Sequence, residues 1–450
     1  MENEVKIDLS KGIIADSKNP AEFLDSSKIL QNGIFADLHI HSKYSRATSK
    51  NLSLENLEKY ARIKGVNLLG TGDFQHPEWS KILNTLEEKE GILYSKTGFP
   101  FIWQTEISLM YTQGRGRRVH FVILAPNREV AKEITKFLAS KGRLDYDGRP
   151  IFGFSALELV KALEQISQDI EIIPAHAWTP YFGIFGSMSG FDSLKECFQE
   201  KTSSIHAIET GMSSSPEMNW HLSELNNKAI VSFSDLHSFW PWRIAREATI
   251  FKKPEGTLTY KELIRQIREN DILGTIETDP SYGKYHWDGH RNCNFSCSPL
   301  ETKKLKGICP VCHEQLTVGV EYRVEELTNQ QIQDYPNKKP FLKLLPLHEL
   351  ISFSIGSPLA SKKTWAIYDK MISMFGNEFN ILINIPREQL QEFGELLTEL
   401  ILKNRQGNLK VKPGYDGTYG EIDDIVKAKV GDDEKEAKPL TPSSPQKTLF

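Results

Sequence analysis

The chain has 450 residues, 39% of them hydrophobic and 25% charged, and its formal net charge is -4. These values are typical of globular proteins, and no apolar run approaches the roughly 18 residues that a membrane-spanning helix needs. A disordered chain and a membrane protein are therefore excluded. The charged N-terminal stretch leads into no apolar segment, which predicts a cytoplasmic protein without a signal peptide.

Short β-rich runs alternate with amphipathic stretches from about residue 33 to 278, the pattern of strands joined by crossover helices. Helices are expected at 53–64, 128–139, 155–166 and 260–270, where apolar residues recur at spacings of three and four, with Ser53 as an N-cap. This pattern predicts an α/β body, and seven candidate strands favour closure into a barrel. The strands are 34–40, 66–71, 101–110, 119–124, 170–174, 204–209 and 229–234.

After residue 285 the sequence changes character, because four of the five cysteines gather in two close pairs. Thiolates in such pairs typically form a closed tetrahedral zinc site, so we predict one structural zinc ion. The expected ligands are Cys293, Cys297, Cys309 and Cys312. His290 or His313 is the alternative for one of them.

Helical patterning follows from about residue 330, clearest at 390–403, and a charged, Pro/Ser-rich stretch ends the chain. We expect four parts: the α/β body at 1–285, the zinc module at 286–325, a mainly helical domain at 326–412 and a flexible tail at 413–450.

Histidines and carboxylates lie in or just after the predicted strands. His39 and His41 alternate on one strand and so face the same side, and Asp235 and His237 repeat this spacing. Active sites of parallel α/β folds form where the carboxyl ends of strands converge, so we predict one cluster holding two or three divalent ions, Zn, Mg, Mn or Fe. The predicted ligands are His39, His41, Asp73, His76, Glu106, His120, His176, Asp235 and His237. For His76 and His120 a supporting role behind the ligands is the alternative.

Neighbouring divalent ions activate water and stabilise both the attacking and the leaving oxygen of a phosphoryl displacement. The cluster therefore predicts phosphoester hydrolysis by metal-activated water, with Glu106, Asp235 and His237 as catalytic residues. A DNA-binding scaffold without activity is the non-enzymatic alternative.

The ordered set from His39 to His237 resembles the polymerase and histidinol phosphatase (PHP) domain family over roughly residues 33–280. The resemblance implies a distorted seven-stranded barrel of metal-dependent phosphoesterases. The chain departs from the family at Asp73-Phe74-Gln75-His76, where Asp and His are commonly adjacent, and near Ser45-Arg46, where a further His is replaced.

The stretch Gly70 to Trp79, the cysteine module and the helical end are together similar to the endonuclease Q family of PHP-domain DNA repair nucleases. This resemblance covers nearly the whole chain. It implies an archaeal-type, nucleoid-associated enzyme that nicks double- or single-stranded DNA on the 5′ side of deaminated bases, hypoxanthine or uracil, and of abasic sites. A small-molecule phosphoesterase of the PHP family, such as a histidinol-phosphate-like phosphatase, is the alternative.

Basic and aromatic residues near the metal motifs are candidates for DNA contacts, because arginines position phosphates and aromatic rings line pockets for extruded bases. They are Arg115, Arg117, Arg118, Trp178 and Trp240. For any one aromatic residue, packing at the barrel rim is the alternative.

The last residues resemble the interaction motif of the sliding clamp (PCNA), with Gln446, Leu449 and Phe450 at its positions. The chain stops before the usual pair of aromatic residues. The resemblance implies a clamp partner.

Overall fold

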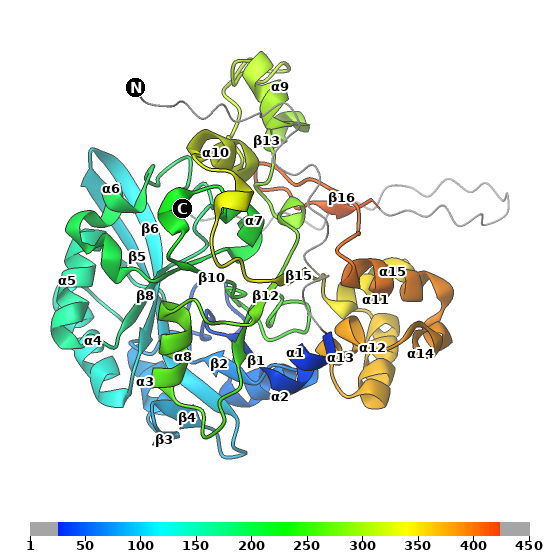
Figure 1. Cartoon of the computed structure of the whole chain (residues 1–450), viewed down its shortest axis with the longest axis horizontal. Helices are drawn as coiled ribbons and strands as arrows, with labels where there is room; N and C mark the ends of the chain where they lie inside the picture. Colours follow the sequence, from blue (N-terminus) through cyan, green and yellow to red (C-terminus); the bar gives the residue numbers. More distant parts are fainter. Residues whose placement is uncertain (1–25, 424–450) are drawn as a thin grey trace.

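A mixed eleven-stranded sheet forms the centre of the protein, in a computed structural model that describes residues 26–423 (Figure 1). Its strands are β1 (Gly33–Asp37), β2 (Leu68–Gly70), β3 (Glu87–Lys89), β4 (Ile92–Tyr94), β5 (Pro100–Gln113), β6 (Arg115–Ala125), β7 (Ile151–Phe152), β8 (Glu171–Pro174), β11 (Ala248–Lys252), β12 (Gly274–Glu277) and β15 (Phe341–Lys343). Their main order is β15-β12-β11-β1-β2-β5-β4-β3, with β6 and β7 beside β5, and β8 beside β6.

All seven expected strands are present, the last two being β9 (Ala207–Glu209) and β10 (Ala229–Val231), which form a separate parallel pair. The expectation of a parallel sheet holds only in part. Strands β5 and β6 form a long antiparallel hairpin through Gly114, whose φ of 73° suits glycine, and β8 is antiparallel to β6. The other strands of this sheet, β3, β4, β7, β11, β12 and β15, were not expected.

Backbone hydrogen bonds beyond the strand ends connect this small pair to the main sheet. Ala177 N donates to Glu209 O at 2.9 Å, and His41 N donates to Leu236 O at 3.0 Å. The loops after β8, β9, β10 and β1 are therefore neighbours. Closure into a seven-stranded barrel stays a prediction.

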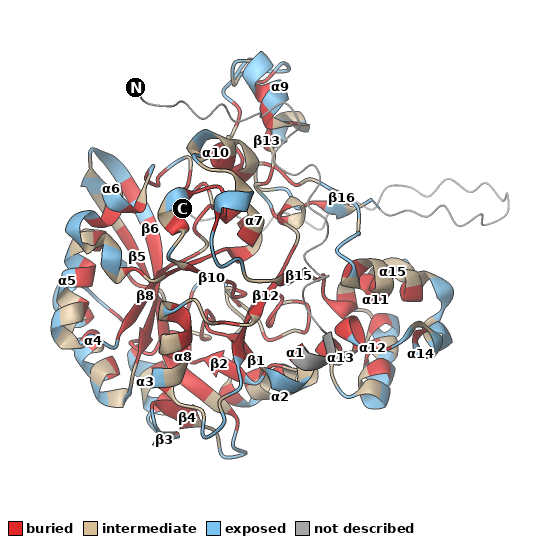
Figure 2. Ribbon diagram, viewed as in Figure 1, coloured by how far each residue is buried: buried red, intermediate tan, exposed pale blue. Residues whose placement is uncertain are grey.

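The four helices expected in the body are confirmed as α2 (Leu54–Lys64), α4 (Arg128–Lys141), α5 (Ala156–Ile166) and α8 (Tyr260–Arg268). Ser53 caps α2, with its side chain accepting a bond from Asn56 N. Shorter helices are α1 (Ser26–Asn32), α3 (Pro77–Leu83), α6 (Leu194–Phe198) and α7 (Pro216–Asn219). Figure 2 shows the middle of the central sheet largely buried and helices α2, α4, α5 and α8 exposing their outer faces. Across residues 26–423, none of the helices is both long and apolar enough to cross a bilayer.

The cysteine module consists of β13 (Asp288–His290), β14 (Phe295–Cys297) and α9 (Pro299–Lys304), followed by α10 (Val320–Leu327). Next along the chain, β15 joins the main sheet, so the stretch expected to start a separate helical domain also completes the central sheet.

The C-terminal helices are α11 (Leu347–Ser354), α12 (Lys362–Phe375), α13 (Glu378–Ile383), α14 (Arg387–Leu390) and α15 (Glu395–Arg405), and they gather beside α1 (Figure 1). The helix expected at 390–403 is interrupted between α14 and α15, because Gly394 has a φ of 101°, outside the helical region.

The prediction of a flexible tail from residue 413 was wrong for the first residues of this stretch. Strands β16 (Val411–Lys412) and β17 (Glu421–Ile422) pair, and the Tyr415 hydroxyl donates to Asn294 Oδ1 of the cysteine module at 2.9 Å. Residues 413–423 thus pack on the module. The clamp-motif residues Gln446, Leu449 and Phe450 lie outside the described residues.

Candidate active site

Two groups of potential metal ligands share the buried carboxylate of Glu106. The first contains His39, His41, Glu106 and Asp235, and the second contains Glu106, His120 and His176. Within each group the ligand atoms lie within 4.8 Å of one another. Glu106 Oε2 lies 3.1 Å from His41 Nε2, while Oε1 lies 2.7 Å from His120 Nδ1. The two oxygens thus face different groups, as in a carboxylate that bridges two cations.

The strand-end residues of the centre meet for the reason expected from the sequence, whereas Glu106 and His120 lie within an antiparallel hairpin that was not expected. His39 and His41 follow β1, His176 follows β8 and Asp235 follows β10, while Glu106 and His120 lie on the paired strands β5 and β6. Residues far apart in the sequence converge because neighbouring strands end at the same edge.

Carboxylates behind the two first histidines orient the imidazoles. His39 Nδ1 lies 2.9 Å from Glu209 Oε1, and His41 Nδ1 lies 3.1 Å from Asp73 Oδ1. Each carboxylate favours a proton on Nδ1, which leaves Nε2 free to bind a cation. Ser45 takes part as well, because its hydroxyl donates to Asp73 Oδ2 at 2.8 Å.

A buried nitrogen without a hydrogen-bond partner indicates that the site fits a metal ion. His39 is fully buried, and its Nε2 has no hydrogen-bond partner among the described residues. A buried polar atom without a partner is costly, and a divalent cation held between imidazole nitrogens and carboxylate oxygens would satisfy it. The donor set therefore fits the predicted divalent ions.

Electrostatics at the centre agree with this fit. Burial opposes the charged form of His39, but the carboxylates of Glu209, Glu106 and Asp235 outweigh it and raise the pKa of His39 well above its ordinary value. Burial likewise opposes ionisation of Glu106, yet His120 and Arg149 hold its pKa well below the usual range. The carboxylates of the centre thus favour a positive charge, which a proton on His39 supplies and a bound cation would replace.

Three residues of the site have backbones in the left-handed region, namely Asp73 (φ 43°), His176 (φ 33°) and Asp235 (φ 48°). Such conformations are unfavourable for non-glycine residues and persist only where the surroundings enforce them. Their clustering here marks a functional site.

Three predicted ligands lie outside the two groups. Asp73 is behind His41, as described above. His76 stacks on Tyr44 with ring centroids 4.3 Å apart, and burial lowers its pKa. His237 adjoins the first group, with its ring centroid 4.7 Å from that of His41, and its Nδ1 faces Asp235 O at 2.8 Å.

Two residues of the centre, Glu209 and Arg149, were not predicted from the sequence. Glu209 ends a predicted strand, the same position as the predicted ligands, and this placement could have revealed it. Arg149 carried no such signal, because it lies in a loop. Its Nη1 lies 3.2 Å from Glu106 Oε2.

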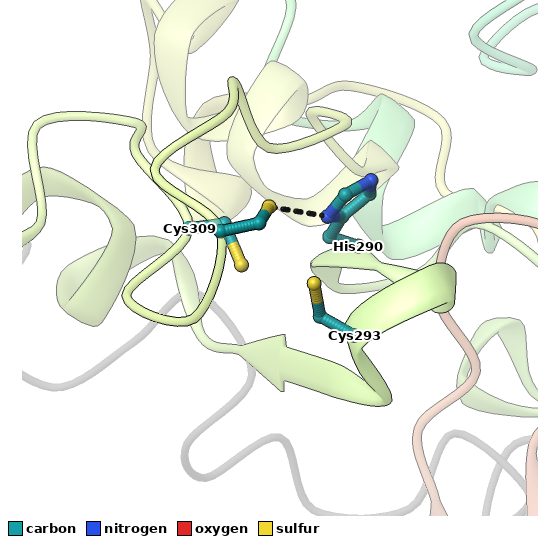
Figure 3. Close-up of side chains that lie close together, drawn as sticks. His290, Cys293 and Cys309 are labelled. Carbon is teal, nitrogen blue, oxygen red and sulfur yellow. Dashed lines mark hydrogen bonds between the residues drawn. The ribbon is translucent and has the colours of Figure 1, made fainter.

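In the cysteine module, the residues that come together are His290, Cys293, Cys309 and Cys312. Figure 3 shows His290, Cys293 and Cys309 turned toward one another, and His290 Nδ1 lies 3.1 Å from Cys312 Sγ. Cys297 lies outside this group, with its buried Sγ 3.2 Å from Thr302 Oγ1. The four-cysteine site stays a prediction, and the residues that come together favour its alternative with His290.

Two of the five residues expected to contact DNA are buried, and Arg115 donates from Nη2 to Gly190 O at 3.1 Å. Trp178 is fully buried and donates from Nε1 to Asn219 Oδ1 at 2.7 Å. Arg117 is 6% exposed and pairs with Glu196. Arg115 and Arg118 are exposed, and Trp240 is partly buried and stacked on Trp242.

Comparison with known sequences gives matches to a domain family and to proteins whose names do not state a function. Residues 346–408 match the family described as the MJ0043 C-terminal domain. Uncharacterized protein MJ0043 of Methanocaldococcus jannaschii is 31% identical over 253 residues, which are 55% of this chain but only 31% of that protein. Uncharacterized protein YqxK of Bacillus subtilis is 28% identical over 411 residues, 86% of this chain and 99% of that protein.

Comparison with solved structures is more informative. The lesion-specific endonuclease PfuEndoQ from Pyrococcus furiosus is 29% identical with a TM-score of 0.78, covering 88% of this chain and 98% of the other. Endonuclease Q in complex with a 27-mer duplex carrying an abasic lesion at the active site matches with the same identity, TM-score and coverage of this chain.

Proposed function

The chain resembles endonuclease Q over nearly its whole length, and from this premise we propose that it is a metal-dependent DNA repair endonuclease. It hydrolyses the phosphodiester on the 5′ side of deaminated bases, hypoxanthine or uracil, and of abasic sites. The observation that carries the proposal is the coincidence of a buried histidine and carboxylate centre with a fold whose solved counterpart holds an abasic-site duplex at its active site.

Bound divalent ions would supply an activated water and stabilise the attacking and leaving oxygens. His39, His41 and Asp235 would hold one ion, His120 and His176 another, and Glu106 would lie between them. Glu209 and Asp73 fix the protons of the first two imidazoles on Nδ1, so that the site is preorganised. His237 lies beside Asp235, where it can serve as a further ligand or contact the substrate.

The remaining parts are assigned by the same reasoning. A structural zinc ion is held by His290, Cys293, Cys309 and Cys312. The exposed Arg115 and Arg118 contact DNA phosphates, and a cytoplasmic, nucleoid-associated location follows from a DNA substrate.

For the clamp motif, pulldown with the sliding clamp should be lost on deletion of residues 446–450, and an unchanged pulldown would reject that partner.

The decisive experiment is cleavage of end-labelled duplexes carrying one deoxyinosine, deoxyuridine or abasic site, in Mg or Mn, with undamaged duplex as control. A nick just 5′ of the lesion is expected. Turnover of a small phosphomonoester without any nick would favour the phosphatase alternative.

Asp235→Asn should reduce cleavage of the abasic-site duplex by about 100-fold or more, because it removes an anionic oxygen from the first metal group. DNA binding, measured by fluorescence anisotropy, should be retained. Full cleavage by this variant would contradict the role of Asp235.

A further inference from the structure

We propose that Arg149 binds the phosphate group of the phosphodiester that is cleaved and positions it beside Glu106. This inference rests on the proposed function. It adds an anion-binding residue to a centre whose other members are metal ligands and their carboxylate partners.

The guanidinium is partly exposed and lies beside the centre. Its Nη1 lies 3.2 Å from Glu106 Oε2, the same oxygen that is 3.1 Å from His41 Nε2. The Arg149 side chain is 26% exposed, whereas the side chains of Glu106 and His41 are fully buried. An anion approaching from solvent would therefore meet Arg149 at the ligand groups.

The loop that carries Arg149 is fixed against the site on both sides. Gly148 N donates to Tyr44 O at 3.0 Å, and Ser108 N donates to Pro150 O at 3.0 Å. Gly148 packs so closely that a Cβ there would lie 2.2 Å from Asp73 Oδ2. Only glycine fits, and the chain is thereby held where residue 149 reaches Glu106.

A purely structural role, in which Arg149 only pairs with Glu106, explains its position poorly. Glu106 belongs to both metal groups, so bound cations would share its charge and weaken its hold on the guanidinium. A planar guanidinium matches two phosphate oxygens at once, and a DNA phosphate would supply the negative charge that Glu106 gives up.

Cleavage kinetics of the full-length protein on the abasic-site duplex test the proposal. Arg149→Ala should lower kcat/KM roughly 10- to 100-fold, as expected for loss of a charge-assisted hydrogen bond, and Arg149→Lys should restore part of it. Arg143→Ala is the matched control, because Arg143 begins the same loop, is 75% exposed and pairs with Asp145 at 3.0 Å. Metal content and melting temperature should be unchanged in all three variants.

A second duplex identifies the group that Arg149 binds. Binding is measured in the Asp235→Asn background with the abasic-site duplex and with one whose linkage 5′ of the lesion is an uncharged methylphosphonate. Arg149→Ala should weaken binding about tenfold on the first duplex and not on the second, whereas Arg143→Ala should change neither.

Equal losses on both duplexes, or cleavage by Arg149→Ala at the wild-type rate, would overturn this inference while leaving the nuclease intact. A wild-type protein that neither binds nor cleaves the abasic-site duplex would overturn both.

Discussion

Glu209 shows how a residue that touches no substrate can govern the centre. Its carboxylate lies 2.9 Å from His39 Nδ1, and its Oε2 accepts a hydrogen bond from His176 N at 2.6 Å, so it supports a histidine of each metal group. Groups that orient metal-binding imidazoles are worth a large part of the metal affinity.

Glu209→Gln should therefore lower the affinity for the active-site ions about 10- to 100-fold, measured by titrating metal into chelator-treated protein. Glu171→Gln is a matched control, since Glu171 is also buried and lies 3.0 Å from His206 Nδ1, outside the metal groups. Equal affinities of Glu209→Gln and wild type would show that His39 is oriented by other contacts.

A second prediction concerns Glu247, which is fully buried with bonds from Ser232 Oγ and Thr278 N. Burial raises the pKa of Glu247 to about 8 from its ordinary 4.5. Between these values the folded protein holds a proton that the unfolded chain has lost, so this group makes the free energy of unfolding fall as pH rises.

Glu247→Gln has no such proton, and its melting temperature relative to wild type should increase steadily from pH 5 to pH 8. Thermal unfolding at several pH values measures this difference. A difference that is constant across the range would mean that Glu247 is ionised in the folded protein.

At the scale of elements, the hairpin of the cysteine module decides which sulfurs meet. Strand β14 ends at Cys297, whose side chain lies against Thr302 in the module's helix α9. His290, at the end of β13, lies with the other three cysteines. Spacing along the chain does not contain this information, because all four cysteines have plausible zinc-site intervals.

Cys297→Ser should therefore keep one equivalent of zinc and a near-normal melting temperature, while Cys309→Ser should lose the zinc and destabilise the module. Zinc content by mass spectrometry of the purified variants distinguishes them. If Cys297→Ser loses the zinc and His290→Ala retains it, the four cysteines are the ligands.

At the scale of the whole molecule, a buried ion pair joins the body to the C-terminal helices. Lys64, at the end of α2, donates from Nζ to Glu378 Oε1 at 2.6 Å, and both side chains are buried. Leu347 N and the Tyr368 hydroxyl also donate to this carboxylate, so Glu378 collects bonds from α2, α11 and α12.

Glu378→Ala should destabilise the protein by about 3–5 kcal/mol, because it leaves the Lys64 ammonium buried without its partner. Denaturant unfolding measures this loss. Glu392→Ala, which removes an exposed partner of Lys370, should have little effect. Similar stability of the two variants would mean that Lys64 reaches water or releases its proton at little cost.

From the sequence, the α/β class, the seven strands of the body and most of the side chains that gather around Glu106 could be predicted. Strand and helix periodicity, and the His39/His41 alternation, are local properties that a chain displays before it folds. The resemblance of the chain to endonuclease Q, confirmed by the solved structures, was readable for the same reason.

Which further residues join each site became visible in the folded protein alone. Glu209 and Arg149 reach the centre from a strand end and a loop without a motif, and the side chains of Trp178 and Arg117 are buried with partners inside the protein. The gathering of His290 with Cys293, Cys309 and Cys312 has the same origin. Such assignments depend on distances between segments far apart in the chain, which residue spacing does not encode.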